Sequence, residues 1–194
     1  MLKFGVAASV LALLTACSSM PAPPRQALDI CAVFAEKTDW RQPAAKSEAR
    51  WGIPVPVLMA TMFHESSYRA DARPPRHYYL GFIPGPRPSS AYGYAQALDG
   101  TWDDYVKRQS RWFASREDFA DAIDFIGWYH YGTTRELGMR PDDTMNLYLA
   151  YHEGRAGFAR NSYLAKPELM DYTSGKVVQT EMSYRQQYAA CPLR

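Results

Sequence analysis

The segment that most constrains this chain is an apolar run, residues 58–67, which includes a carboxylate at Glu65. On a helical period Leu58, Met62 and Glu65 fall on one stripe, so a helix here would turn its acid toward the core. Burial disfavours the charged form of a carboxyl group, and a protonated glutamate is what a general acid requires. The alternative is a frayed helix end at which Glu65 reaches water. Glu65 alone does not decide between the two.

Most of the remaining chain also has helical patterns. Asp29 is a predicted N-cap for a helix over 30–37, and Pro43 suits the first position of a second helix that runs to about residue 50. Thr101 and Asp104 resemble a capping box at the start of a third. Further helical patterns cover residues 115–138, 141–154 and 177–190. No segment alternates as a strand does, so we expect a single all-α domain.

One irregular insertion, residues 71–90, interrupts this pattern. Its prolines and glycines are interleaved with aromatic residues, which argue against disorder. We expect a long ordered loop or a small hairpin. Two interpretations are open: a cleft wall on which sugars stack, or a lid that packs on the core and touches no ligand.

The beginning of the chain is typical of an exported protein. Residues 1–16 combine a short positive start with an apolar run too short to span a bilayer, and they are predicted to be a signal peptide. Residues 14–17 resemble a bacterial lipobox, so Cys17 is the expected lipid anchor, with soluble secretion as the alternative. Residues 17–28 are the expected tether and 29–194 the folded domain. Ser18 resembles an outer-membrane sorting signal, which implies a domain facing the periplasm.

The cysteine count agrees with this compartment. Assigning Cys17 to lipid leaves Cys31 and Cys191, which we expect to pair as a disulfide in an oxidising periplasm. Two buried free thiols are the alternative. The formal net charge of +2 is too small to indicate a nucleic-acid partner.

Three separated motifs resemble a known family. They are residues 64–67 (His-Glu-Ser-Ser), residues 91–96 (Ala-Tyr-Gly-Tyr-Ala-Gln) and residues 150–154 (Ala-Tyr-His-Glu-Gly). In this order they resemble the lytic transglycosylases of the soluble-lytic-transglycosylase type. Residues 45–62 resemble the family's lead-in to its catalytic helix. The resemblance covers roughly residues 45–160 and implies an all-α fold related to goose-type lysozyme.

The resemblance implies roles for individual residues. Glu65 would be the catalytic acid and base, Tyr151 the hydroxyl that orients its carboxyl group, and Gln96 a polar contact to the substrate. Gly93 would let the backbone pass close to the ligand or the catalytic helix. Ser66 follows the acid in the Glu-Ser motif and is a further substrate-binding candidate.

Two motif positions depart from the family pattern. Tyr94-Ala95 replaces Leu-Met, so Tyr92 or Tyr94 would substitute by stacking on the substrate. His152 stands where the family has asparagine; it could hydrogen-bond to the substrate as an amide does, but it adds a titratable group.

The implied reaction needs one carboxylate and no cofactor. Ordinary glycosidases use two acids, whereas this family cleaves peptidoglycan strands with one and closes a 1,6-anhydro ring on N-acetylmuramic acid. Asp71, Asp99 and Glu153 have other interpretations as loop charge, helix cap and motif residue. A hydrolytic muramidase on the same fold and a non-catalytic peptidoglycan-binding lipoprotein are the alternatives. No metal site is expected, since no metal-ligand spacing is present and His130 is expected to be a hydrogen-bonded core residue.

Overall fold

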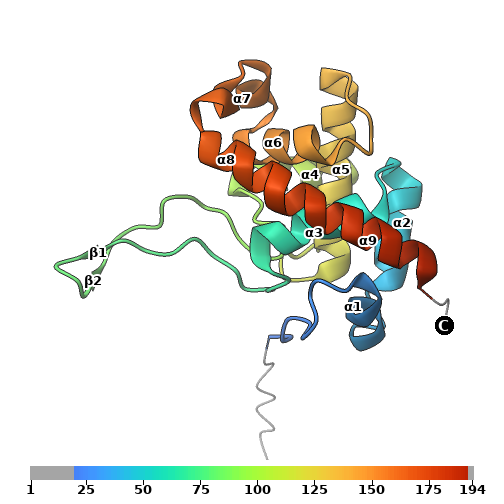
Figure 1. Ribbon diagram of the computed structural model, residues 1–194. Coiled ribbons are helices and arrows are strands. Elements are labelled where there is room, and N and C mark those ends of the chain that lie inside the picture. The colour runs from blue at the N-terminus through green and yellow to red at the C-terminus, as the bar shows by residue number, and fades with distance from the viewer. Residues whose placement is uncertain (1–19, 192–194) are drawn as a thin grey trace, which may run out of the picture.

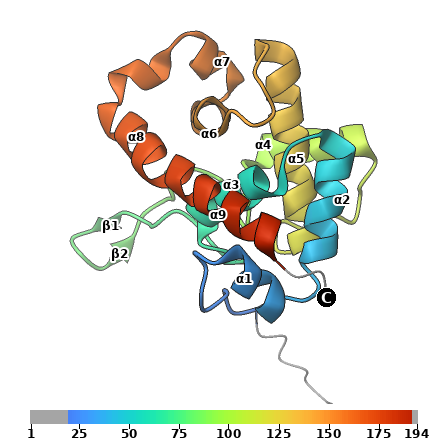
Figure 2. The same ribbon diagram turned by 45° about the vertical axis from the view of Figure 1, so that its right-hand side comes forward.

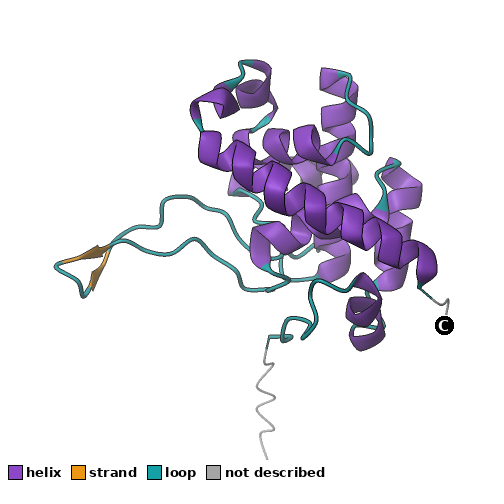
Figure 3. Cartoon of the chain, in the orientation of Figure 1, coloured by secondary structure: helices purple, strands orange, loops and turns teal. Residues whose placement is uncertain are grey.

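The structure is a computed structural model that describes residues 20–191, and it is almost entirely helical (Figures 1 and 3). This confirms the all-α fold class. The helices are α1 (Ile30–Glu36), α2 (Arg41–Trp51), α3 (Val55–Ser66), α4 (Asp99–Gln109), α5 (Phe119–Leu137), α6 (Thr144–Glu153), α7 (Arg155–Ala159), α8 (Pro167–Tyr172) and α9 (Val178–Ala190). The short elements are a 3-10 turn η1 (Ser162–Ala165), a π-helical turn η2 (Thr173–Val177), and the antiparallel strands β1 (Tyr78–Tyr79) and β2 (Ile83–Pro84).

Helix α3 forms the centre of the core. Every residue from Val55 to Met62 is buried, and the helix packs against α2, α5 and α9. The prediction of a single buried stripe was therefore too narrow, because neighbouring helices surround the first two turns. Pro54 precedes the helix, and Ser67 ends it with a left-handed conformation (φ 51°). Burial fixes this helix, and with it the position of Glu65 in its last turn.

The chain closes on itself through its last helices. α8, η2 and α9 follow one another as one long helical rod across the domain (Figures 1 and 2). Cys191, directly after α9, forms the predicted disulfide with Cys31 of α1, with the two Cα atoms 5.5 Å apart. The bridge joins the first and last helices of the described chain.

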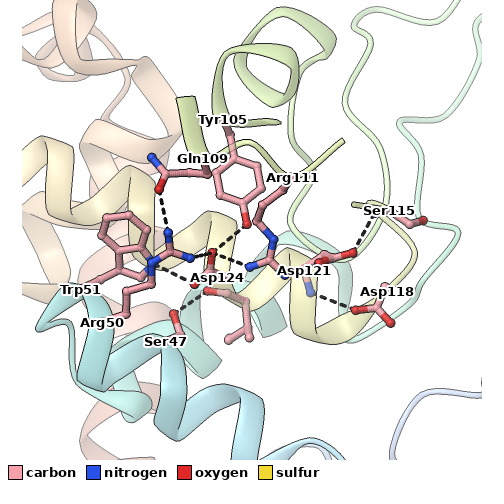
Figure 4. Close-up of polar contacts among 11 residues, drawn as sticks. Ser47, Arg50, Trp51, Tyr105, Gln109, Arg111, Ser115, Asp118, Asp121 and Asp124 are labelled. Atoms are coloured by element: carbon pink, nitrogen blue, oxygen red, sulfur yellow. Dashed lines mark hydrogen bonds and ion pairs between the residues drawn. The ribbon is translucent and has the colours of Figure 1, made fainter. Parts of the chain in front are cut away.

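A buried carboxylate joins α2 and α5 (Figure 4). Asp124 accepts hydrogen bonds from Trp51 Nε1 (2.9 Å), the Tyr105 hydroxyl (2.7 Å), Arg50 Nη1 (3.1 Å) and Arg111 Nη1 (2.9 Å). Since buried charges are stable only when paired and hydrogen-bonded, this network is a structural joint. It fixes α5, the helix that places His130 in the core beside α3.

The predicted helix ends were partly right. Asp29, Gly138 and Gly154 begin or end helices as expected. The capping box at Thr101 is wrong: α4 begins two residues earlier, at Asp99, after Leu98, which makes no side-chain capping bond. This helix also ends at Gln109, before two aromatic residues that follow it in the sequence. Trp112 and Phe113 are 67% and 100% exposed and lie in the following turn.

The insertion forms a hairpin arm, defined here as residues 71–90, that projects away from the helices (Figures 1 and 2). Its strands pair Tyr79 with Ile83 and Tyr78 with Pro84. Leu80 and Phe82, between and beside the strands, are 82% and 72% exposed. The prediction of a small hairpin is confirmed. Of the two open interpretations, the lid packed on the core is wrong, because the residues of the tip are exposed, and the cleft wall stays a prediction.

The predicted signal peptide and Cys17 lie outside the described residues. Within residues 20–191, no helix has the length and apolar character needed to cross a membrane.

Candidate active site

Glu65 faces a cleft of about 450 Å³ between α3, α6 and α8. Its lining is polar and aromatic: His64, Glu65, Tyr148, His152, Lys166, Glu168, Leu169 and Tyr172. α3 supplies the first two residues, and α6 supplies Tyr148 and His152. The structure thus brings two of the three sequence motifs to one cleft.

The carboxyl group of Glu65 has the character expected of a general acid. Its Oε1 atom is buried without a hydrogen-bond partner, and the residue as a whole keeps partial exposure to the cleft. Burial raises the pKa of Glu65 to about 7, and a hydrogen bond with Tyr148 lowers it by a smaller amount. A group with this pKa can donate a proton and take one back near neutral pH.

Tyr148 is the hydroxyl that contacts Glu65, and the prediction of Tyr151 in this role is wrong. The Tyr151 hydroxyl donates instead to the carbonyl oxygen of Ala95, 2.6 Å away. Both tyrosines lie on α6, one turn apart, so they share a face. Burial, and after it the Glu65 charge, raises the pKa of Tyr151, so that side chain lies near the acid. Helical spacing could have indicated Tyr148, since it precedes Tyr151 by three residues.

His64 lies beside Glu65 and is held neutral. Its Nδ1 is 2.7 Å from the Tyr172 hydroxyl, and its Nε2 is 2.9 Å from Thr180 Oγ1. Burial lowers the pKa of His64 to about 4. A neutral imidazole adds no positive charge that would depress the pKa of the neighbouring acid. The sequence had indicated no role for this residue.

Glu153, the acid in the third motif, is committed to an ion pair. Its carboxylate accepts from Lys166 Nζ (2.6 Å) and Ser162 Oγ (2.6 Å), and these bonds lower its pKa to about 2. It therefore stays ionised and cannot donate a proton at neutral pH. The His152 Nδ1 atom lies 3.1 Å from the same carboxylate.

A second hollow, of about 200 Å³, adjoins the cleft at His152, which lines both. Gln96 and Tyr151 also line this second hollow. The Gln96 amide donates to the carbonyl oxygens of Ala72 (2.8 Å) and Gly93 (2.9 Å), so its N–H groups hold the loop. Gln96 and His152 therefore keep positions from which a bound chain could be contacted.

Three other predicted residues lie away from the cleft. Ser66 is buried and donates to the Met62 carbonyl oxygen (3.1 Å), and Tyr94 is a core residue that packs on Trp40. Their predicted substrate contacts are wrong, because neither side chain reaches the surface of the cleft. Tyr92 lines a separate pocket at the base of the hairpin arm.

Gly93 and His130 lie among residues that support the fold. The Gly93 backbone, with φ 78°, passes so close to the main chain of Arg116 that a Cβ atom would not fit there. Its predicted proximity to the ligand or the catalytic helix stays a prediction. His130 Nε2 lies 3.0 Å from Thr61 Oγ1 in the core, as predicted. That bond ties α5 to α3 one turn before Glu65.

Glu168 was missed by the sequence analysis. It is an exposed carboxylate at the start of α8 and lines the Glu65 cleft. No motif surrounds Glu168, so the sequence carries no signal that marks it as a second carboxylate.

Comparison with known families gives one match. The family model described as the transglycosylase SLT domain matches residues 5–191. No curated protein and no solved structure matches the chain.

Proposed function

The chain belongs to the transglycosylase SLT domain family, and we propose from this premise that it is a lytic transglycosylase of peptidoglycan. It cleaves the β-1,4 bond between N-acetylmuramic acid and N-acetylglucosamine and leaves 1,6-anhydro-N-acetylmuramic acid ends. The observation that carries the proposal is Glu65 itself, an acid whose pKa is raised to about 7 and which faces an open cleft.

In the proposed reaction Glu65 first donates a proton to the substrate and then takes one from it. The protonated carboxyl group donates to the glycosidic oxygen as the bond from that oxygen to C1 of N-acetylmuramic acid breaks. The resulting carboxylate takes the proton of the C6 hydroxyl as its oxygen bonds to C1. No water is consumed and Glu65 ends protonated. Tyr148 fixes the rotamer of the carboxyl group without adding charge.

Digestion of purified sacculi followed by mass spectrometry of the soluble products tests this proposal. The wild-type protein is expected to release muropeptides with anhydro ends, and Glu65→Gln is expected to release none. Glu153→Gln is the matched control, because Glu153 is an acid nearby that stays ionised in an ion pair. Equal product from the wild type and Glu65→Gln would refute the assignment of Glu65.

A hydrolytic muramidase is a second candidate, favoured by Glu168 in the same cleft. An exposed carboxylate there could activate water as the general base of a two-acid mechanism. Hydrolysis would give reducing ends and incorporate ¹⁸O from labelled water. Reducing ends that disappear in Glu168→Gln would favour hydrolysis, whereas anhydro ends that persist in this variant would favour the lytic reaction.

We also propose that Cys17 anchors the protein by lipid to the outer membrane, with the domain facing the periplasm. The disulfide between Cys31 and Cys191 supports an oxidising compartment and leaves Cys17 as the remaining cysteine. Labelling of cells with a radioactive fatty acid is expected to mark the wild-type protein and not Cys17→Ser. Release of the wild type from membranes by salt alone would contradict the anchor.

A further inference from the structure

A third hollow, the arginine pocket, lies at the base of the hairpin arm. It measures about 180 Å³ and is lined by Arg73, Arg87, Ser89, Ser90, Ala91, Tyr92, Asp99 and Arg116. Three guanidinium groups face one carboxylate, which leaves two positive charges in excess (3 − 1). A hollow with this charge concentrates anions, and arginine forks match carboxylates in shape.

Some N–H donors of these guanidinium groups have no acceptor among the described residues. Arg87 donates to the Pro74 carbonyl oxygen, while its Nε atom is buried without a partner. Arg73 lies 4.0 Å from the centre of the Tyr92 ring, and Asp99, the acid that lines the pocket, does not pair with it. Arg116 is the one that is paired, with Asp99 at 2.8 Å. A buried donor without an acceptor is costly, and a bound anion would satisfy it.

The arginine pocket and the hollow of Gln96 are lined by consecutive residues of one segment. Ala97 and Leu98 line the hollow of Gln96, and Asp99, the next residue, lines the arginine pocket. Arg116 Nη1 also donates to the Ala97 carbonyl oxygen (3.0 Å), which fixes the pocket against this segment. A polymer that lies along the cleft would bring its side groups toward the three arginines.

We propose that the arginine pocket binds carboxylates of the peptide stems on N-acetylmuramic acid. This inference rests on the proposed function, since peptidoglycan is the substrate that carries such stems. The stems are acidic peptides with several carboxylates, while the glycan itself is neutral. The pocket would make the protein select glycan strands that still bear their peptides.

Binding of soluble oligosaccharides with and without peptide stems tests the proposal without any need for catalysis. In the Glu65→Gln background, calorimetry is expected to give a Kd roughly tenfold lower for the stem-bearing compound, as a charge-assisted bond provides. Arg73→Gln should remove that preference, and Arg73→Lys should restore part of it. Arg108→Gln is the control, an arginine that pairs with Asp104 on the exposed face of α4.

The outcomes separate this inference from the proposed function. Equal affinity of the Glu65→Gln protein for both compounds, or a preference that survives Arg73→Gln, would overturn the arginine pocket as the stem site, even if anhydro ends are formed. A stem preference that Arg73→Gln abolishes would support the pocket even if the products were reducing ends. Unfolding temperature checks that Arg73→Gln is folded.

A separate observation concerns the hairpin tip, defined as Tyr78, Tyr79, Leu80, Phe82 and Ile83, all exposed. The arm carries this apolar group away from the helices (Figure 1). Between Asp71 and Asp99 every Lys, Arg, Asp or Glu is an arginine: Arg73, Arg76 and Arg87. An apolar tip with basic flanks and tyrosines is typical of segments that enter the interface of anionic membranes.

We propose that the hairpin tip inserts into an anionic phospholipid surface. The positive charge of the arm favours anionic over zwitterionic lipid, and the five apolar side chains supply buried area at the acyl boundary. The contact is independent of any lipid on Cys17 and would hold the base of the arm, with its arginine pocket, close to the membrane.

Vesicle flotation tests this with the chain from Ser18 onward, which contains every described residue and lacks Cys17. It is expected to float with vesicles of phosphatidylglycerol and phosphatidylethanolamine, and not with phosphatidylcholine alone. Leu80→Ser with Phe82→Ser should abolish flotation. Trp112→Ser with Phe113→Ser is the matched control, since these aromatic residues are also largely exposed but lie outside the arm. Absence of flotation, equal loss in the control, or tip-dependent dimers in light scattering would overturn the lipid contact.

Discussion

The hydroxyl of Tyr148 hydrogen-bonds the Glu65 carboxyl group, while the buried Oε1 atom of that group has no partner. The acid is therefore contacted by a neutral donor and is largely buried at the edge of the cleft. This arrangement holds a proton near neutral pH and still fixes the direction in which it is delivered.

Tyr148→Phe is expected to reduce kcat by roughly tenfold or more, because it removes a hydrogen bond to an ionisable group. The bond lowers the pKa of Glu65, so its loss should raise that pKa above about 7 and move the pH-rate profile to higher pH. Profiles of sacculus digestion between pH 4 and 10 measure both effects. Tyr151→Phe is the control, since it loses a bond to a main-chain carbonyl and should leave the profile in place. A shift of the pH-rate profile that is larger in Tyr151→Phe than in Tyr148→Phe would contradict the role given to Tyr148.

Glu65 should also make the fold less stable as pH rises. Its pKa is higher in the folded protein (about 7) than the ordinary value of 4.5, so its contribution to stability is complete below pH 4.5 and is lost as pH rises through 7. The loss is about 3 kcal/mol. Glu65→Gln lacks this titrating group. The free energy of unfolding of Glu65→Gln relative to the wild type should therefore be higher at pH 8 than at pH 4 by that amount. Urea unfolding at both pH values measures it, and a constant difference would show that Glu65 is not desolvated.

The sequence predicted the fold well where local chemistry decides structure. Asp29 begins α1 because its side chain accepts hydrogen bonds from the first turn of the helix, and Gly138 ends α5 because it adopts the left-handed conformation. The predicted start of α4 was wrong because the side chain of Leu98, its N-cap residue, makes no capping bond. The burial of Trp102 in the core determines where the helix begins. The direction of the hairpin arm could not be predicted, since its exposed apolar tip violates the rule that such residues are buried.

The sequence predicted that Glu65 lies at the candidate site, and it predicted only part of the residues around it. Glu65 was recognisable because an acid on an apolar helix is costly, and this cost is visible in the sequence. Tyr148 and Tyr151 lie one turn apart on α6. Which of the two contacts Glu65 depends on how α6 packs against α3, and the sequence pattern does not show this. Tyr94 reads as an exposed stacking residue, but the left-handed Gly93 before it turns its ring into the core against Trp40.

Reduction of the Cys31–Cys191 disulfide should lower the free energy of unfolding by roughly 2–5 kcal/mol, because the bridge closes a loop of almost the whole domain. Urea unfolding with and without a reducing agent measures the difference. The double variant Cys31→Ala, Cys191→Ala is the control and should not respond to the reducing agent. Reactive thiols at these two positions in the denatured, unreduced protein would show that the bridge does not form in solution.

Asp124→Ala should destabilise the protein by about 3–5 kcal/mol, since it leaves two arginines, an indole and a tyrosine without their shared buried acceptor. Asp104→Ala removes an acid of the exposed pair with Arg108, and its cost should stay below about 1 kcal/mol. Thermal and urea unfolding compare the two. Because the Asp124 network holds α5 against α2, and α5 bonds α3 through His130 and Thr61, Asp124→Ala should also weaken activity at temperatures where the domain is still folded. A Glu65 pH profile that stays unchanged in this variant would show that the network supports stability alone.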